Sequence, residues 1–571
     1  MNTNNGSSLP IDTADARACT KLIAGLPLTN AREAHQTLVM LLTGLAHRPP
    51  PAAAYLDVLE TARAPLAYLQ DEIAQRYASR PLPPTPAEGE AFRQVLALWQ
   101  AMARAYAQVA QAGSGDPGIQ GRLALICQRC VHYAGKVILE FCRARREPSP
   151  GTWIDLHGYY ATAEEWGIDK TAVPEPLNET NKSQSAAEAY IAILLVDLAS
   201  PFSRSAHEFS WICRWARRFA PLTVVRPLGE PVATRAFGID LMRDASTRPL
   251  ELLSRSASVR WFDTRQLSPM IQEMLARLRE RQSPAALGLG DDCPATVASR
   301  LLLQLYKPWC LNATPRRFQR RGASGIAQVC LGFEATHYHV GGIEFNQPEH
   351  VRIYSRSDME RIWTFRDQLD PTQLNVRSSQ MQLGYPLERW EVENQSVSGF
   401  RLQRGEAGAR IEHGQLFCLR PPDGEHFLLA QVSWNLMQKD DLLIGIHVLP
   451  GVPQAIAVRP TGIKVSPSER YERAFLLPAV PALKEEATLV LPRGWFQPER
   501  VVEVYTDRQT KLKLVELLNH GPDFERITNE WVLLGDQVQQ LFTNTPIANL
   551  PNFSISVTGS GPITFKLTLG K

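Results

Sequence analysis

The stretch from Gly414 to Leu449 reads GQLFCLRPPDGEHFLLAQVSWNLMQKDDLLIGIHVL. Short apolar runs alternate in it with residues that form turns. Asp423–Gly424 lies between two of these runs and predicts a hairpin, because an Asp-Gly pair accommodates the positive φ that tight hairpin turns need. Strands joined by such turns predict an antiparallel sheet.

Runs of the same kind lie on both sides of this stretch. They include IAQVCLGF before it, and AIAVRP, ATLVLP and RVVEVYTD after it. Many short strands at this spacing favour a β-barrel or a sandwich. We therefore expect a barrel over residues 323–465 and a β-rich extension over residues 466–571, whose last residues also form strands.

The first half of the chain has a different pattern. Residues 14–47, 51–79 and 87–113 are rich in Ala, Leu, Gln, Glu and Arg, and their apolar residues recur every three or four positions. Proline-rich stretches separate these segments, as helix breakers do. Further helices are expected over residues 118–146, 159–167, 183–199, 205–219, 266–282 and 294–306. The pattern predicts an all-α bundle or irregular solenoid over residues 1–308, and hence a multidomain α + β protein.

Residues 309–322 form the link between the halves and contain the run PRRFQRRG from Pro315 to Gly322. Side chains alternate sides in an extended segment, so Arg316 and Arg320 point to the same side. Arg317 and Arg321 likewise point to the same side as each other. Each pair offers two planar guanidinium groups, which suit bidentate contact with phosphate and stacking on a purine. Taken alone, the cluster is more simply interpreted as a solvated basic linker.

A second polar motif follows in the run ENQSVSGF, residues 393–400. Asn394 and Ser396 are two residues apart, so on a strand they share a face. An amide beside a hydroxyl can offer both a donor and an acceptor to the edge of a base. Gly399, which has no Cβ, permits a sharp turn or the close approach of a ligand. Taken alone, this motif is also compatible with a polar turn that enters a strand.

An R-x-x-x-R motif in a linker, followed by D/N-x-S-x-x-G at a strand, resembles the signature of PilZ domains. The stretch from Gly414 to Leu449 is similar to the PilZ pattern of a hairpin, a strand ending near a Trp and a final strand containing Gly. The resemblance covers about residues 315–450. It implies a receptor for the bacterial second messenger cyclic di-GMP, with no catalytic residue, no metal and no cofactor besides this ligand.

The resemblance also implies roles for the two motifs. The arginines would wrap over the ligand and contact its phosphates and guanine faces. Both Arg316 with Arg320 and Arg317 with Arg321 satisfy the spacing, and the sequence does not choose between them. Asn394 and Ser396 match the positions that contact guanine and phosphate from the barrel surface, and Gly399 matches the glycine at which the chain turns beside them.

The two motifs are further apart than in typical members of the family. The run CLGFEATHYHVGGIEF, residues 330–345, is expected to supply the first strand, and residues 346–385 are then an insertion. Such an insertion is tolerable, since each doubling of a loop costs only about 0.6 kcal/mol of closure entropy. Four neighbouring positive charges repel one another, and the ligand would supply the counter-charge. We therefore expect ligand binding to order the linker and to rearrange the two halves. The helical half is expected to contact a protein partner.

Other constellations favour structural roles. Cys127-x-x-Cys130 with His132 lies in an apolar-periodic helix and has no second cysteine pair, which predicts core cysteines rather than zinc. His337 and His339 would share a strand face, with His350 further on, but nothing fixes a third ligand. Residues 208–222 are rich in Arg and Trp and are best interpreted as a half-buried helix. Residues 288–292 are glycine-rich, but no strand precedes them, so they are a poor nucleotide fingerprint.

The 571 residues carry 61 Lys and Arg against 58 Asp and Glu, a net charge of +3. A protein that binds the nucleic-acid backbone usually has a clear basic excess, so a local arginine cluster favours a small anion over DNA. The most apolar segment, residues 190–198, is too short to span a bilayer. Without an apolar run near the start, we expect a cytoplasmic protein with no membrane span and with reduced thiols.

Two other classes of function stay open. One is a protein–protein scaffold, in which helical hairpins bind the partner and the barrel has lost its ligand. The other is a single-stranded RNA binder, in which arginines and nearby aromatic rings stack on bases. The three classes differ in their response to cyclic di-GMP and to salt.

Overall fold

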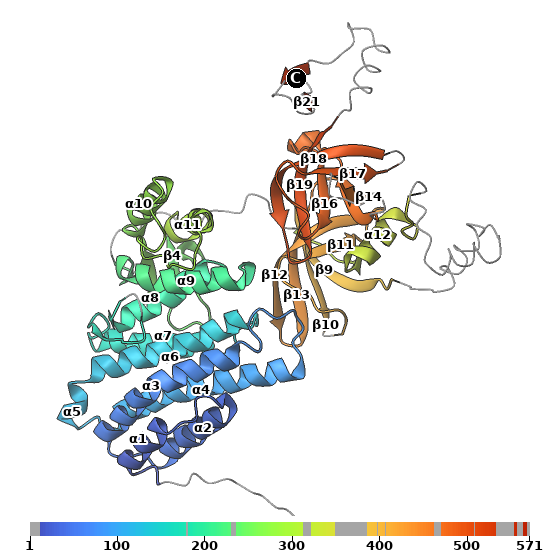
Figure 1. Ribbon diagram of the computed structural model, residues 1–571. Helices are drawn as coiled ribbons and strands as arrows, with labels where there is room; N and C mark the ends of the chain where they lie inside the picture. Colours follow the sequence, from blue (N-terminus) through green and yellow to red (C-terminus); the bar gives the residue numbers. More distant parts are fainter. Residues whose placement is uncertain are drawn as a thin grey trace, which may run out of the picture. The chain divides into compact units, whose positions relative to one another are not determined.

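The computed structural model describes residues 12–178, 181–229, 236–311, 321–348, 385–396, 398–405, 407–461, 470–506, 509–532, 553–556 and 564–567 (Figure 1). The chain divides into two units. The first comprises Met1–Arg317 with Leu436–Asp440, and the second comprises Phe318–Asn435 with Asp441–Lys571. The expected class is confirmed: the first half is helical and the second is antiparallel β-barrel.

Helices dominate the first unit. They are α1 (Ala16–Ala24), α2 (Ala31–His47), α3 (Ala52–Ala74), α4 (Pro86–Ala112), α5 (Pro117–Gln120), α6 (Leu123–Arg143), α7 (Thr152–Glu165), α8 (Ala186–Leu198), α9 (Ala206–Phe219), α10 (Leu267–Arg279) and α11 (Ala295–Cys310). Short 3-10 turns lie at η1 (Pro201–Ser203), η2 (Ala220–Leu222), η3 (Leu250–Leu252) and, in the second unit, η4 (Pro481–Leu483).

Side-chain caps fix where several helices begin. Thr85 and Glu88 form a capping box at α4, because each side chain bonds the backbone N–H of the other residue. The segment predicted to be helical over residues 14–47 is helical but contains a break between residues 24 and 31. The chain forms α1 and α2, and Asn30 caps the second by accepting a hydrogen bond from the N–H of Glu33.

Helix α6 is the central helix of this unit, because its two faces belong to two different cores (Figure 1). Tyr133 and Val137 pack with α1–α4, while Val131 and Ile138 pack with α7–α11. Its apolar residues therefore surround most of the helix, as expected for a helix buried between layers.

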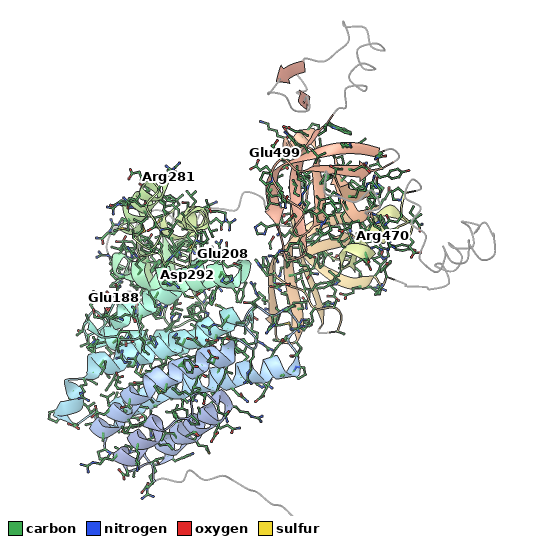
Figure 2. All side chains as sticks on the ribbon, in the orientation of Figure 1. Glu188, Glu208, Arg281, Asp292, Arg470 and Glu499 are labelled. Atoms are coloured by element: carbon green, nitrogen blue, oxygen red, sulfur yellow. The ribbon has the colours of Figure 1, made fainter. Side chains whose placement is uncertain are left out.

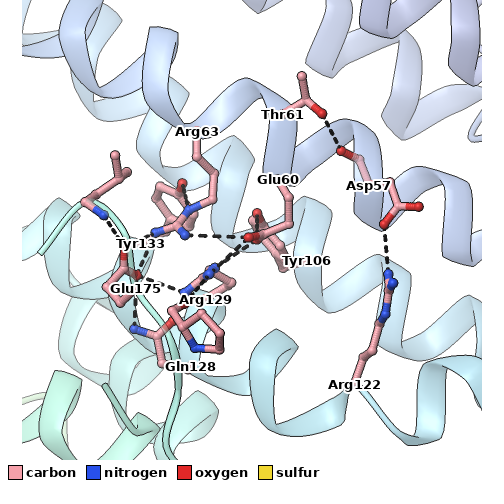
Figure 3. A network of polar contacts seen from close by, with 12 residues as sticks. Asp57, Glu60, Thr61, Arg63, Tyr106, Arg122, Gln128, Arg129, Tyr133 and Glu175 are labelled. Carbon is pink, nitrogen blue, oxygen red and sulfur yellow. Dashed lines mark hydrogen bonds and ion pairs between the residues drawn. The ribbon is translucent and has the colours of Figure 1, made fainter. Parts of the chain in front are cut away.

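A buried network of charges ties α3 and α6 to the segment that follows α7 (Figure 3). Glu175 is 1% exposed and lies 2.6 Å from Arg63 Nη2 and 2.8 Å from Arg129 Nη1. Arg129 Nε also lies 2.8 Å from Glu60 Oε1, which accepts a hydrogen bond from Tyr106. Opposite charges compensate one another here, which buried ions require.

The helical half also contains short strands that the sequence did not predict. Strands β3 (Val224–Pro227), β4 (Phe237–Asp240), β5 (Arg248–Pro249) and β6 (Val259–Asp263) form an antiparallel sheet in the order β3-β6-β4-β5. Strands β1 (Val173–Pro174) and β2 (Ser183–Gln184) form a separate pair.

The second unit begins with a six-stranded barrel, called the first barrel below. Its strands are β8 (Ile326–Cys330), β9 (Glu388–Ser396), β10 (Gly399–Gly405), β11 (Leu416–Arg420), β12 (Leu428–Gln438) and β13 (Asp441–Val448), with β7 (Arg321–Gly322) added beside β9. The sheet order is β10-β13-β12-β11-β8-β9-β7, and β10 also pairs with β9, which closes the ring. The hairpin predicted at Asp423–Gly424 is confirmed as the turn between β11 and β12.

The strand expected over residues 330–345 is wrong beyond its first residue. The first strand is β8, and the chain then forms helix α12 (Phe333–Gly341). Gly332 and Gly342 flank this helix with φ of +85° and +71°, values that glycine adopts without strain. Residues 349–384, most of the predicted insertion, lie outside the described residues.

The second barrel is closed in the order β14-β15-β16-β19-β18-β17. Its strands are β14 (Gln454–Pro460), β15 (Glu472–Leu477), β16 (Thr488–Pro492), β17 (Val501–Tyr505), β18 (Gln509–His520) and β19 (Phe524–Trp531). It shares a core with the first barrel, because Leu416, Leu429 and Leu449 pack with Phe475 and Phe524. Strands β20 (Phe553–Ser556) and β21 (Thr564–Leu567) pair near the end of the chain, as expected.

Candidate ligand-binding site

Strand β9 carries an extra residue just before the predicted polar motif. Leu402 of β10 lies opposite Val392, whereas the preceding residue, Arg401, lies opposite Asn394. Glu393 therefore has no residue opposite it in β10 and forms a β-bulge. A bulge reverses the alternation of side chains beyond it.

The bulge places the motif on the outer face of the first barrel. Val392 and Leu402 lie in the barrel interior, 4% and 0% exposed. Without the bulge, Asn394 would share the interior side with Val392, because alternate residues of a strand face the same way. Asn394 and Ser396 instead share a face with Arg401, which is partly exposed. The prediction that they share one strand face is confirmed.

The backbone at the end of the arginine cluster lies beside this motif. Arg321 pairs with Gln395, and Gly322 pairs with Asn394, in antiparallel register between β7 and β9. Gln395 is the residue between the two motif side chains. The other predicted arginines, Arg316, Arg317 and Arg320, lie outside the described residues.

Among the described residues, the Ser396 hydroxyl of the motif has a hydrogen-bond partner and the side-chain oxygen of Asn394 has none. Ser396 donates a hydrogen bond of 3.3 Å from its hydroxyl to the backbone oxygen of Gly399, across the turn from β9 to β10. Asn394 Oδ1 is buried, and no donor within the described residues bonds it. A buried acceptor without a donor is costly, so this oxygen suits an external N–H group.

Gly399 is required by close packing between strands. A Cβ at this position would collide with the backbone oxygen of Ile446 in β13. The glycine therefore allows β10 and β13 to approach each other closely next to the motif. Its φ is not in the left-handed region, so its role is space rather than turn geometry.

Sequence reasoning missed a cation that lies next to the motif. Arg401 Nε is 2.5 Å from Glu393 Oε2, and its guanidinium carbon is 5.8 Å from the ring centroid of Trp434. Gly445 of β13 lies opposite Arg401, and a Cβ there would collide with the Trp434 ring. Arg401 of β10 and Trp434 of β12 therefore meet over a residue that has no side chain.

The other constellations have structural roles. Cys127 and Cys130 lie in the core of unit 1, and burial raises the pKa of the Cys127 thiol to about 11. His337 lies on α12 rather than on a strand, and its Nε2 is 3.0 Å from the backbone oxygen of Ile456. His339 Nε2 contacts the backbone oxygen of Tyr385. The described residues contain no group of three or more His, Cys, Asp or Glu that could hold a metal ion, and His350 lies outside them.

The Arg- and Trp-rich segment is a half-buried helix, as predicted. Trp211 and Trp215 of α9 are 7% and 0% exposed. Trp211 donates to Asp292 and Trp215 to the backbone oxygen of Leu289, so the glycine-rich loop packs over α9. Figure 2 labels Asp292 at this loop. Among the helices that the structure describes, none is both long enough and apolar enough to cross a bilayer.

Three family models match the chain in sequence order. The model "Cyclic-di-GMP receptor FimW, N-terminal domain" matches residues 17–228, "Cyclic-di-GMP receptor FimW, middle PilZ domain" matches residues 236–361, and "FimW C-terminal beta-barrel domain" matches residues 456–530. The resemblance to PilZ-domain cyclic di-GMP receptors with a helical N-terminal region is thereby confirmed. These models describe receptors, which are binding proteins and not enzymes.

A relative with a curated description agrees with the models. The chain is 24% identical over 538 residues to the cyclic-di-GMP receptor FimW of Pseudomonas aeruginosa, and the similarity covers 84% of each chain.

The family models cover the second barrel more fully than the first. The match to the C-terminal model falls within the second barrel, Gln454–Trp531. The match to the middle model starts in the helical half and ends at residue 361, before β9, so Asn394, Ser396 and Gly399 lie beyond it. The domain boundaries given above, 1–308, 309–322, 323–465 and 466–571, stay predictions.

Proposed function

We propose that this protein is a cytoplasmic, non-enzymatic receptor that binds cyclic di-GMP between its arginine cluster and the outer face of the first barrel. The observation that supports this most directly is the register of β7 on β9. The backbone of Arg321 lies opposite Gln395, between the two polar residues of the strand motif. The backbone at the end of the arginine cluster therefore lies beside the strand motif, which supports a site formed by both.

The chemistry of the two sides suits the two kinds of group in the ligand. Cyclic di-GMP carries two phosphates and two guanines, and guanidinium groups bind phosphate oxygens in pairs and stack on purines. Asn394 offers a buried acceptor without a donor, which a guanine N–H would satisfy. Ser396 offers a hydroxyl whose weak bond to Gly399 can be exchanged for a phosphate oxygen.

Both arginine pairs remain candidates for the phosphate contacts. Arg317 with Arg321 and Arg316 with Arg320 have the same spacing, and each pair would approach the motif from the chain that leads into β7. Separate double substitutions distinguish them. Substituting the pair that contacts the ligand should weaken binding by more than the loss of two positive charges alone does.

The signal would pass through the linker. Four guanidinium groups close together repel one another, and the ligand phosphates would relieve that repulsion by drawing the arginines onto the barrel. Because the cluster lies where unit 1 meets unit 2 in the sequence, binding would change how the units are held and so alter a surface offered to a protein partner. Small-angle scattering with and without saturating ligand tests this step; identical profiles would exclude it.

Isothermal calorimetry with cyclic di-GMP tests the binding itself. We expect stoichiometric binding that Ser396→Ala, Arg316→Ala/Arg320→Ala or Arg317→Ala/Arg321→Ala weakens by about tenfold or more, the effect of losing charge-assisted hydrogen bonds. Arg389→Ala is the matched control, because Arg389 is exposed on the same strand outside the motif. Absence of binding would favour the scaffold function, and salt-sensitive RNA binding without cyclic di-GMP binding would favour the RNA binder.

A further inference from the structure

Cys330 and Cys418 lie directly opposite each other on two neighbouring strands of the first barrel. Cys330 is the last residue of β8, Cys418 is the middle residue of β11, and the antiparallel register pairs them. Both carry free thiols, and they are 1% and 0% exposed in the core that the two barrels share. Residues directly opposite in antiparallel strands have Cα atoms about 4.5–5.5 Å apart, within the range of about 4.4–6.8 Å that disulfides span. The backbone therefore already holds the two cysteines at a spacing that a disulfide can bridge.

The Cys-x-x-Cys pair of α6 differs in this respect. Cys127 belongs to the core formed with α7–α11, and Cys130 belongs to the core formed with α1–α4. Their side chains therefore pack into separate cores, although only two residues lie between them in the sequence. Cys330 and Cys418 are far apart in the sequence, and the sheet brings them together.

The surroundings make the two thiols unequal. The Cys330 thiol donates a 3.9 Å hydrogen bond to the hydroxyl of Thr336 on α12. A hydrogen bond from the Cys418 thiol lowers the pKa of Cys330 against the effect of burial, whereas burial raises the pKa of Cys418. Because the thiolate is the reactive form of cysteine, Cys330 is the thiol that attacks an oxidant and Cys418 is the thiol that follows.

A short connection leads from Cys330 to the surface. Two residues, Leu331 and Gly332, join β8 to α12, and Gly332 is exposed. A Cβ added at Gly332 would meet no atom within 4 Å, so the space beside it is open. A local opening at the end of β8 is therefore sufficient to admit an oxidant as small as hydrogen peroxide.

We propose that Cys330 and Cys418 form a reversible disulfide between β8 and β11, with hydrogen peroxide as the oxidant. The Cys330 thiol attacks one oxygen of hydrogen peroxide, which gives a sulfenic acid at Cys330 and releases one water. The Cys418 thiol then attacks the Cys330 sulfur, the disulfide forms, and the sulfenic oxygen leaves as a second water. Two thiols thus lose two electrons while one peroxide is reduced to two waters, and a dithiol reductant reverses the change by thiol–disulfide exchange. This modification is independent of the proposed cyclic di-GMP site.

The disulfide would stabilise the β unit. Strands β9 and β10 lie between Cys330 and Cys418 in the sequence, so the bond encloses both strands in one covalent loop. Closing a long loop restricts the unfolded chain and so favours the folded state. We expect the thermal midpoint of the oxidised protein to be higher by about 5 °C or more, and to return to the starting value after dithiothreitol.

Peptide mapping of the full-length protein tests the proposal. The reduced protein is treated with hydrogen peroxide under native conditions, the remaining free thiols are alkylated, and tryptic peptides are analysed by mass spectrometry without reduction. We expect a linked pair of peptides that contain Cys330 and Cys418, which dithiothreitol separates. Cys19→Ala, which removes a buried thiol of the helical unit, is the matched control and should retain both the link and the thermal shift.

Single substitutions test the order of the two steps. In Cys418→Ala, dimedone, which traps sulfenic acids, should label Cys330 after peroxide treatment. In Cys330→Ala, Cys418 should stay largely unlabelled, because it is the less acidic thiol. Thermal unfolding of the reduced variants verifies that both are folded.

Several results would overturn the proposal. Absence of the linked peptides after peroxide treatment would exclude the disulfide. A link that forms only in urea would mean that the folded register plays no part. Labelling of Cys418 rather than Cys330 would reverse the assigned order, and a link without a thermal shift would exclude the stabilising role.

Discussion

Asp523, in the turn between β18 and β19, accepts a 2.9 Å hydrogen bond from the backbone N–H of Leu416 at the start of β11. This bond connects the second barrel to the first. Burial raises the pKa of Asp523 to about 6, although the hydrogen bond from Leu416 acts to lower it. The connection between the barrels therefore contains a carboxyl group that titrates between pH 4 and pH 7.

Stability of the β unit should depend on this carboxyl group. Because its pKa in the folded protein lies above the ordinary value of 3.8, the group stabilises the fold fully below about pH 4, and this contribution is lost as the pH rises through about 6. Asp523→Asn should therefore stabilise the protein at pH 7.5 by about 1–3 kcal/mol relative to the unsubstituted chain, and by little at pH 4. Urea unfolding at the two pH values measures this; Glu516→Gln, an exposed position on β18, is the control. A variant without any pH-dependent gain would contradict the prediction.

The buried charge network should be sensitive to loss of its central acid. Glu175→Gln leaves Arg63 and Arg129 without the carboxylate that both contact, and we expect a loss of about 3–5 kcal/mol in the free energy of unfolding. Glu90→Gln removes an exposed partner of Arg93 and should change the unfolding midpoint little. Denaturant unfolding followed by far-ultraviolet circular dichroism compares them. Equal effects at the two sites would mean that the network contributes nothing beyond a surface pair.

Gly399 should tolerate no side chain. Gly399→Ala places a methyl group against the Ile446 oxygen, and we expect destabilisation of about 1–3 kcal/mol with loss of cyclic di-GMP binding, since β10 must move away from β13. Gly405→Ala, on the same strand, meets no atom within 4 Å and should affect neither property. Thermal unfolding and calorimetry of both variants give the comparison. Native ligand affinity in Gly399→Ala would refute the packing role.

Arg401 should support ligand binding by neutralising Glu393. In Arg401→Ala the Glu393 carboxylate is left unpaired beside the proposed phosphate contacts, so affinity for cyclic di-GMP should fall by about tenfold, which corresponds to about 1.4 kcal/mol. Glu393→Gln added to Arg401→Ala should restore most of the loss, because the repelling charge is then gone. Calorimetry of the single and double variants measures this. If the second substitution restores nothing, Arg401 acts by direct contact and not through Glu393.

Local patterns were sufficient for most elements. The helices α3, α4, α8 and α9 begin and end within a few residues of their expected bounds, because proline-rich breaks and Ser or Thr caps mark them in the sequence. The hairpin at Asp423–Gly424 was likewise predictable from turn chemistry. Helix α12 was not, because its run of His, Tyr and Val has strand-like composition, and only Leu331 and Gly332 separate it from β8 in the sequence.

The candidate site was predictable in part. Asn394, Ser396 and Gly399 were identified by spacing, and spacing also indicated that the first two share a face. The bulge at Glu393 decides whether these two side chains face the barrel interior or the outside. It depends on the register with β10 and has no mark in the sequence. The contact between Arg401 and Trp434 joins residues on β10 and β12 over a glycine of β13, so only the order of strands in the barrel reveals it.

The core shared by the two barrels has a consequence for how the β unit forms. A chain that stopped near residue 450 would leave Leu416, Leu429 and Leu449 facing water instead of Phe475 and Phe524. Such a fragment should aggregate. The first and second barrels should therefore melt together in one transition, as a single cooperative body.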